Sequence, residues 1–262
     1  MSDPLPHVMG VSYNRSMEEL AEGKHPMYRT MVRQALGLGL VVTLVVLALS
    51  ACGGGGGQEQ ADKPRPLPEV EKALRPGEEF RTEEFKSSFS FRGGENWAME
   101  TDPPEGPNEL EITWRRGTMN LFIMTIQEVY EPIRSGTPER VDAPKDMVGW
   151  FQHHPYLRTV KQEPVTIGGV KGVQLDMVVE DPPKDYYAMC NSKLGITDCV
   201  DVVALEGFPF LAFEEGIKER VIVLEDVKGE TVTIDFGAAE PKFDEFAPEG
   251  QKVVDSIKWT GS

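Results

Sequence analysis

Two adjacent histidines, His153 and His154, are the residues best suited to acid–base chemistry near neutral pH in the region after residue 52. An imidazole has an ordinary pKa of about 6.5, so it gains or loses a proton close to neutrality. Both stand at the end of a predicted helix, directly before Pro155, where the helix dipole favours the charged form. The alternative interpretation is structural, because histidines at a helix C-terminus stabilise its last carbonyl groups.

Paired carboxylates are the other arrangement that could support catalysis. Glycosidases use two carboxyl groups that lie on either side of the bond to be cut. The chain has 43 Asp and Glu residues, but which of them meet in space is not visible in a sequence. Abundant acids usually form a solvated surface. A hydrolase that uses paired carboxylates is therefore an alternative function, and no residue is assigned as catalytic.

An apolar run without charged residues begins at Ala35 and ends at Leu49-Ser50-Ala51-Cys52. The basic residues that most closely precede it are Lys24, Arg29 and Arg33. A charged region, an apolar region and a small-residue end are the parts of an export signal, here residues 1–34 and 35–52. The last four residues resemble the lipobox of bacterial lipoproteins. This resemblance implies that a signal peptidase recognises Leu49, Ser50 and Ala51, and that Cys52 carries diacylglycerol.

The lipobox resemblance implies a location. Two acyl chains anchor a protein stably, so the mature chain is expected on the extracytoplasmic face of the cell membrane, held by Cys52. Signal peptides are usually shorter ahead of the apolar run, so either Met1 is not the true start or residues 1–26 form a cytosolic tail. An uncleaved transmembrane helix is the alternative, although the run is slightly short for the ~20 residues that a spanning helix needs.

The remaining chain divides at about residue 80. Residues 53–79 are rich in glycine, proline and charge, a composition that predicts a flexible linker. Residues 80–262 have the length of one globular domain with one core.

Cys190 and Cys199 are the two cysteines that lipidation leaves. An even pair in an exported protein is typical of a structural disulfide, and this one would close a short loop and contribute about 2–3 kcal/mol. A redox role is disfavoured because no CxxC motif is present. Zinc binding with His153 and His154 is disfavoured because adjacent histidines usually point apart. No metal or other cofactor is expected.

The net charge of the chain limits its partners. The formal charge is −16, and residues 1–52 contain four acidic and four basic residues, so the mature part keeps this charge. An acidic surface repels phosphate backbones, which makes nucleic-acid binding improbable. The expected partners are the membrane, through the lipid on Cys52, and an envelope protein or a small ligand.

Aromatic residues near the cysteine pair form a candidate binding surface. Tyr186, Tyr187 and Phe208 flank the 190–199 loop and are hard to bury completely. Exposed aromatic side chains beside a rigid loop are typical of protein recognition sites. The tryptophans are better explained by core packing, since Trp150 and Trp259 continue the apolar faces of two predicted helices.

Strand patterns dominate the domain, with β-branched and aromatic residues in short runs between Gly and Pro turns. The predicted strands are residues 85–91, 97–100, 110–115, 121–130, 163–167, 172–180, 201–204, 208–213, 219–225 and 230–236. The last two are expected to pair through a turn in which Gly229 takes a positive φ.

Two helices are predicted beside these strands. The first begins with Asp142 as its N-cap and ends before Pro155. The second is C-terminal, and its apolar residues recur at helical spacing: Phe246, Gly250, Val253, Val254 and Ile257. Strands in runs with helices set apart predict an α+β fold with a mostly antiparallel sheet.

The order of these elements also resembles PsbP-like α/β domains. The residues that carry this resemblance are the strand 85–91, the helix ending at His154-Pro155, PVTIGGVKG (164–172) and FDEFAPEGQKVVDSIKW (243–259). Such domains are often small exported or lipid-anchored proteins without catalytic residues. The expected function is therefore a non-enzymatic, lipid-anchored binding or accessory protein of the bacterial cell envelope. A purely structural envelope component is a further alternative to the hydrolase.

Overall fold

The computed structural model describes residues 63–69, 71–99, 106–115, 119–183, 198–205 and 211–260, and the backbone of 185–186. The signal segment and the lipobox lie outside these ranges, as do Tyr187, Cys190 and Phe208. Tyr186 is placed by its backbone alone.

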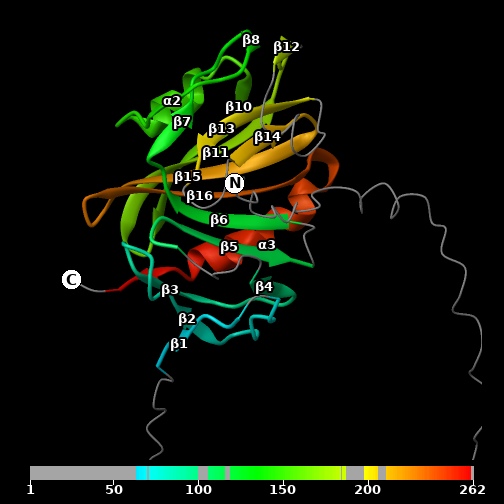
Figure 1. Ribbon diagram of the computed structural model, residues 1–262. Coiled ribbons are helices and arrows are strands. Elements are labelled where there is room, and N and C mark those ends of the chain that lie inside the picture. The colour runs from blue at the N-terminus through cyan, green and yellow to red at the C-terminus, as the bar shows by residue number, and fades with distance from the viewer. Residues whose placement is uncertain are drawn as a thin grey trace, which may run out of the picture. The chain divides into compact units, whose positions relative to one another are not determined.

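An antiparallel sheet of seven strands forms the centre of the domain, in the order β10-β11-β15-β16-β6-β5-β4 (Figure 1). Its strands are β4 (Trp97–Met99), β5 (Glu109–Trp114), β6 (Met119–Thr125), β10 (Leu157–Ile167), β11 (Val170–Val179), β15 (Ile217–Val227) and β16 (Glu230–Ala239). The β15–β16 hairpin turns at Lys228 and Gly229, with φ of 58° and 87°. The positive φ predicted for Gly229 is confirmed.

Three smaller sheets flank this one. The first has the order β14-β13-β7-β9 and contains β7 (Glu128–Tyr130), β9 (Arg140–Asp142), β13 (Cys199–Ala204) and β14 (Leu211–Glu214). The second has the order β1-β2-β3-β17 and contains β1 (Arg65–Pro66), β2 (Glu79–Arg81), β3 (Phe89–Arg92) and β17 (Lys258–Trp259). In the third, β8 (Ser135–Gly136) pairs in parallel with β12 (Asp185–Tyr186).

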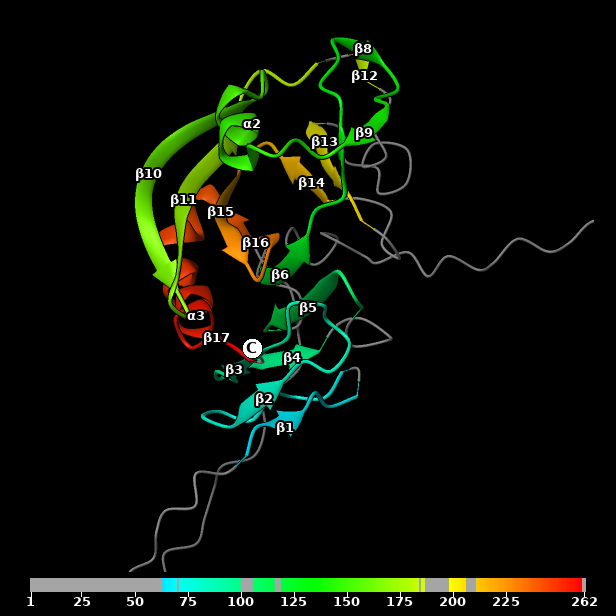
Figure 2. The ribbon, with the colours of Figure 1, turned by 90° about the vertical axis from the view of Figure 1, so that its left-hand side faces the viewer.

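Two α-helices are described, α2 (Met147–His153) and α3 (Phe243–Asp255), and a 3₁₀ turn, η2 (Glu240–Lys242), leads into α3. Figure 2 shows β10 and β11 curving from the side of α2 towards α3. This arrangement of a mostly antiparallel sheet with two packed helices confirms the predicted α+β fold class.

Both faces of the large sheet are buried, each against its own core. Successive side chains of a strand point to opposite sides, so one strand contributes residues to both cores. On β15, Ile222 and Leu224 join the core beneath α3. Val221 and Val223 join a second core with residues of α2, β13 and β14. The sequence predicted one hydrophobic core, whereas the structure has two cores that the sheet separates.

Helix α3 packs against the first core with its predicted apolar stripe. The buried residues of this stripe are Phe246, Gly250, Val253 and Val254. Gly250 allows the closest approach, since a Cβ there would lie 2.9 Å from the ring of Phe236. The predicted buried face of this helix is confirmed.

Two sequence predictions about local structure were wrong. The N-cap of α2 is Asp146, whose side chain accepts a hydrogen bond from Gly149 N at 2.7 Å, and not Asp142. Asp142 instead pairs with Glu128 at the end of β9. The predicted strand 121–130 is divided into β6 and β7, because residues 126–127 leave the large sheet and β7 joins the β13 sheet.

Part of the segment predicted as linker packs within the domain. Leu74 is 1% exposed and belongs to the core beneath α3. Ala73 forms a bridge with Ala98, and β1 pairs with β2. The sequence does not predict this packing, because the apolar residues stand singly between proline-rich turns and show neither a helical nor a strand period. The packed domain therefore includes residues 63–79.

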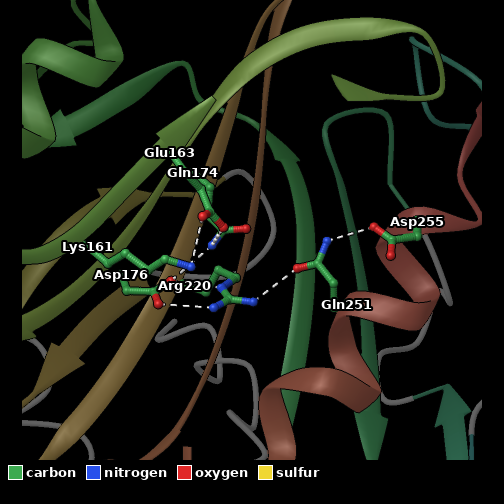
Figure 3. Close-up of polar contacts among 7 residues, drawn as sticks. All are labelled: Lys161, Glu163, Gln174, Asp176, Arg220, Gln251 and Asp255. Atoms are coloured by element: carbon green, nitrogen blue, oxygen red, sulfur yellow. Dashed lines mark hydrogen bonds and ion pairs between the residues drawn. The ribbon is translucent and has the colours of Figure 1, made fainter. Parts of the chain in front are cut away.

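A line of polar contacts crosses the sheet from β10 to α3 (Figure 3). At its centre Arg220 on β15 donates two hydrogen bonds to the carboxylate of Asp176 on β11, at 2.8 and 3.0 Å. Their side chains are 13% and 3% exposed. Arg220 also donates to Gln251 of α3 at 3.1 Å, and its guanidinium lies 5.4 Å from the Phe243 ring centroid. Sheet and helix are joined through this one cation.

Replacing Asp176 with Ala is expected to lower the free energy of unfolding by about 3–5 kcal/mol, because it leaves the buried guanidinium of Arg220 without its counter-charge. Urea denaturation of the purified protein measures this loss. The control is Arg158→Ala, which removes an ion pair between half-exposed side chains and should cost less than about 1 kcal/mol. Equal losses of unfolding free energy in the two variants would show that the buried pair stabilises the fold no more than a surface pair does.

Candidate functional site

His153 and His154 lie at the C-terminal end of α2 in different environments. His153 Nδ1 lies 2.6 Å from the carbonyl oxygen of Gly149, as expected of a histidine that stabilises the end of a helix. His154 is 4% exposed and lies between the rings of Trp150 and Tyr156, at centroid distances of 5.1 and 5.9 Å. The two side chains therefore do not form a joint site.

The charged form predicted for these histidines is wrong for His154. Burial lowers its pKa from 6.5 to about 4, so it is neutral at physiological pH. The N–H of Tyr156 points at His154 Nδ1 over 3.4 Å, while Nε2 has no partner in the described part of the chain. Desolvation outweighs the helix dipole here, since the helix has only two turns and aromatic rings surround the imidazole. His154 is therefore unsuited to act as a general base at neutral pH, because its imidazole is buried away from water.

A pair of buried carboxyl groups lies on the large sheet instead. Glu219 on β15 is 8% exposed and Asp235 on β16 is 3% exposed. Burial raises the pKa of Glu219 to about 8, and the nearby carboxylate of Glu214 adds to this rise. Burial also raises the pKa of Asp235 well above its ordinary value, with a further contribution from Glu219. Both acids therefore favour the neutral form, Glu219 beside Glu214 and Asp235 beside Glu219.

Strand register places these acids on one face. Val221 pairs with Asp235, and Glu219 lies two residues before Val221, so both carboxyl groups point to the side of the second core. Glu219 pairs with Gly237, and a Cβ at that glycine would overlap the Glu219 carboxylate. Glycine at 237 thus leaves the space in which the Glu219 carboxyl group lies.

Neighbouring strands extend this face with polar side chains. Asp235 pairs with Phe122 on β6, and Asn120 lies two residues before it on the same side. Asn120 pairs in turn with Thr113 on β5. We call the set Thr113, Asn120, Glu219, Thr233 and Asp235 the oxygen-lined face. All five side chains are less than a tenth exposed.

The carboxyl pair was missed because the sequence does not show which acids meet across strands. A local signal existed nevertheless. Asp235 stands between Ile234 and Phe236 in an otherwise apolar strand, and Glu219 precedes the apolar run 221–224. An acid inside a strand of this kind is either paired or functional. Asp176 is paired with Arg220, whereas Asp235 has no ion pair with a described residue.

The aromatic surface predicted at Tyr186, Tyr187 and Phe208 lies outside the residues whose side chains the structure describes. Cys199 is buried at the start of β13, but Cys190 lies outside the described ranges, so their disulfide stays a prediction. Within those ranges no three His, Cys, Asp or Glu side chains are grouped to hold a metal ion. No described helix is long and apolar enough to cross a membrane.

Comparison with known proteins gives similarity of structure alone. No family description matches the chain, and no curated protein matches it significantly. Cyanobacterial PsbP (CyanoP) from Synechocystis sp. PCC 6803 is 12% identical, with a TM-score of 0.36, over 72% of this chain and 96% of its own. LpqN, involved in cell envelope biogenesis of Mycobacterium tuberculosis, is 10% identical, with a TM-score of 0.32, over 71% of this chain and 87% of its own. These values define no function for the chain.

The depressed pKa of His154 predicts acid sensitivity. Protonation favours the unfolded state, where the pKa is near 6.5, so stability falls as the pH drops from 6.5 towards 4, by roughly 3 kcal/mol. His154→Gln is expected to flatten this part of the stability–pH curve, measured by urea denaturation at steps between pH 7 and pH 4. His153→Gln is the matched control, and an equal flattening in both variants would contradict the assignment.

The raised pKa of Glu219 predicts the opposite dependence. Its neutral form is the stable one in the fold, so its contribution is present at low pH and is lost as the pH rises from 4.5 through about 8. Glu219→Gln stays neutral and should therefore exceed the wild type in melting temperature at pH 8, by about 2–4 °C or more, with a smaller difference at pH 5.

Calorimetric melting at both pH values tests this expectation. The control is Glu215→Gln, whose side chain is exposed in the turn between β14 and β15. A Glu219→Gln variant that melts below the wild type at pH 8 would show that the carboxylate is held in its ionised form.

Proposed function

We propose that this chain is a non-enzymatic, lipid-anchored binding or accessory protein on the extracytoplasmic face of the bacterial cell membrane. The observation that carries the proposal is the lipobox-like Leu49-Ser50-Ala51-Cys52, placed shortly before a packed α+β domain that begins near residue 63. A diacylglyceryl group at Cys52 is sufficient to hold such a domain at a membrane.

The buried carboxyl groups support binding more than catalysis. A pair that performs acid–base chemistry has its two pKa values pushed apart, so that one group donates a proton while the other is ionised. Burial raises the pKa of both Glu219 and Asp235. Their shared direction fits a site whose charge is completed by something that binds there.

The hydrolase using paired carboxylates is the second candidate, and the electrostatic interactions among Glu214, Glu219 and Asp235 are the observation in its favour. Glu214 is the least buried of these three acids, since its residue is partly exposed. If Glu214 were the ionised partner of a protonated Glu219, the pair would have the two states that a glycosidase needs. Turnover of an envelope glycan by the wild type, abolished in Glu219→Gln, would decide for this candidate.

Lipidation is tested in bacteria that express the full chain and are fed an alkyne-labelled palmitate. The wild type is expected to incorporate label and to lose residues 1–51, as read by mass spectrometry of its N-terminal peptide. Cys52→Ser should remove both signals, whereas Cys190→Ser leaves them unchanged. Label that persists in Cys52→Ser would contradict the proposed anchor.

The same strains serve to identify a partner by crosslinking in cells. An accessory role predicts capture of one envelope protein by the wild type and its loss in the Cys52→Ser strain. Tyr186, Tyr187 and Phe208 are the proposed contacts, so replacing both tyrosines with Ser should weaken the capture. Unchanged capture would remove this surface from the proposal.

A further inference from the structure

Four oxygen atoms on the oxygen-lined face have no hydrogen-bond partner among the described residues. They are Asp235 Oδ1, Asn120 Oδ1, Thr113 Oγ1 and Thr233 Oγ1. Their residues are 3%, 6%, 2% and 1% exposed, in that order. A buried polar group without a partner destabilises the fold, because it has lost its hydrogen bonds to water. Four of them on neighbouring strands therefore call for a binding partner that the described chain does not supply.

The acids of this face also lack a neutralising cation among the described residues. Glu219 and Asp235 form no hydrogen bond or ion pair with any described basic side chain, and the neighbour that acts on each is another carboxylate. The opposite face of the same sheet shows the contrast, because there Asp176 receives two hydrogen bonds from Arg220. A guanidinium thus completes the buried carboxylate of Asp176, and no described basic side chain does so for Asp235.

We propose that the oxygen-lined face binds a cationic nitrogen group, either a protonated amine or a guanidinium. The unpartnered atoms are all oxygens that accept hydrogen bonds, and these two groups carry three and five N–H donors and no acceptor. A metal ion fits less well, since no three metal-ligating side chains are grouped within the described ranges. The inference deepens the proposed binding role and rests on it.

The side chains that would contact the bound cation come from neighbouring strands of the sheet. Asp235 and Glu219 supply the negative charge, and Asn120 lies on β6 beside the strand that carries Asp235. Glu219 is held over Gly237, because only glycine leaves room there for its carboxyl group. Glu214, on β14 directly before the turn into β15, adds a further carboxylate close to Glu219. A net charge of −16 further concentrates cations around the domain.

Isothermal titration calorimetry on the full chain in detergent micelles tests the proposal, with methylammonium and methylguanidinium as probes and sodium chloride as the control. The wild type is expected to bind one of the probes saturably. Binding ionises a protonated carboxyl group, so the heat should differ between phosphate and HEPES buffers at pH 7 as protons are released. Asp235→Asn should weaken binding at least tenfold while melting no lower than the wild type.

Two further variants separate the site from the fold. Gly237→Ala keeps every charge but displaces the Glu219 carboxyl group, and it should weaken binding too. Glu163→Gln removes a carboxylate from the polar line on the opposite face and should bind as the wild type does. Equal binding by the wild type and Asp235→Asn, or heats that match the sodium chloride control for both probes, would overturn the proposal.

Two probe arms identify the source of the cation. A capped peptide with one lysine or arginine that binds more tightly than the free probes supports the proposal and assigns the group to a partner's side chain. Displacement of methylammonium by micromolar zinc or calcium, with loss of both in Asp235→Asn, would replace the amine with a metal ion and overturn it. Lipid labelling at Cys52 is independent of these results. If labelling is intact and no cation binds, the cation site is rejected and the proposal of a lipid-anchored protein is unaffected.

Discussion

The buried ion pair between Arg220 and Asp176 is the interaction on which the rest of the domain depends. A guanidinium on the inner face of a sheet is stable only when its charge and its N–H groups are satisfied, and here a strand, a neighbouring strand and a helix each contribute. Because Gln251 belongs to α3, this pair fixes how the C-terminal helix lies across β15 and β16. The helix then covers the core that contains Phe236 and Phe243, and β17 follows it back to pair with β3.

The two faces of the large sheet solve the problem of a buried acid in different ways. On the α3 face the chain provides a permanent cation, so the charge is fixed and contributes to one rigid arrangement. On the other face Glu219 and Asp235 have neighbours of like charge, and protonation relieves the strain. A group of this kind carries free energy that a ligand can release, which is typical of functional sites in proteins that are otherwise well packed.

Much of the architecture could be predicted from the sequence, since period-2 alternation and the α3 stripe are local signals. The hairpin at Gly229 and the buried face of α3 follow from a few residues each. The N-cap of α2 could not be chosen between Asp142 and Asp146 without knowing that β9 pairs with β7. The neutral state of His154 depends on rings packed around it, and the placement of Glu219 and Asp235 on one face depends on strand register. These features are long-range, so a single sequence carries no direct record of them.

The early start of the packed domain limits how far it can stand from a membrane. Arg65, in β1, lies 13 residues after Cys52. An extended chain covers at most about 3.6 Å per residue, so a lipid on Cys52 would keep β1 within roughly 45 Å of the bilayer surface. The end of the domain that carries β1 would then lie in a shallow layer next to the membrane. A partner that binds this end would have to enter the layer, either by being embedded in the same bilayer or by approaching it closely.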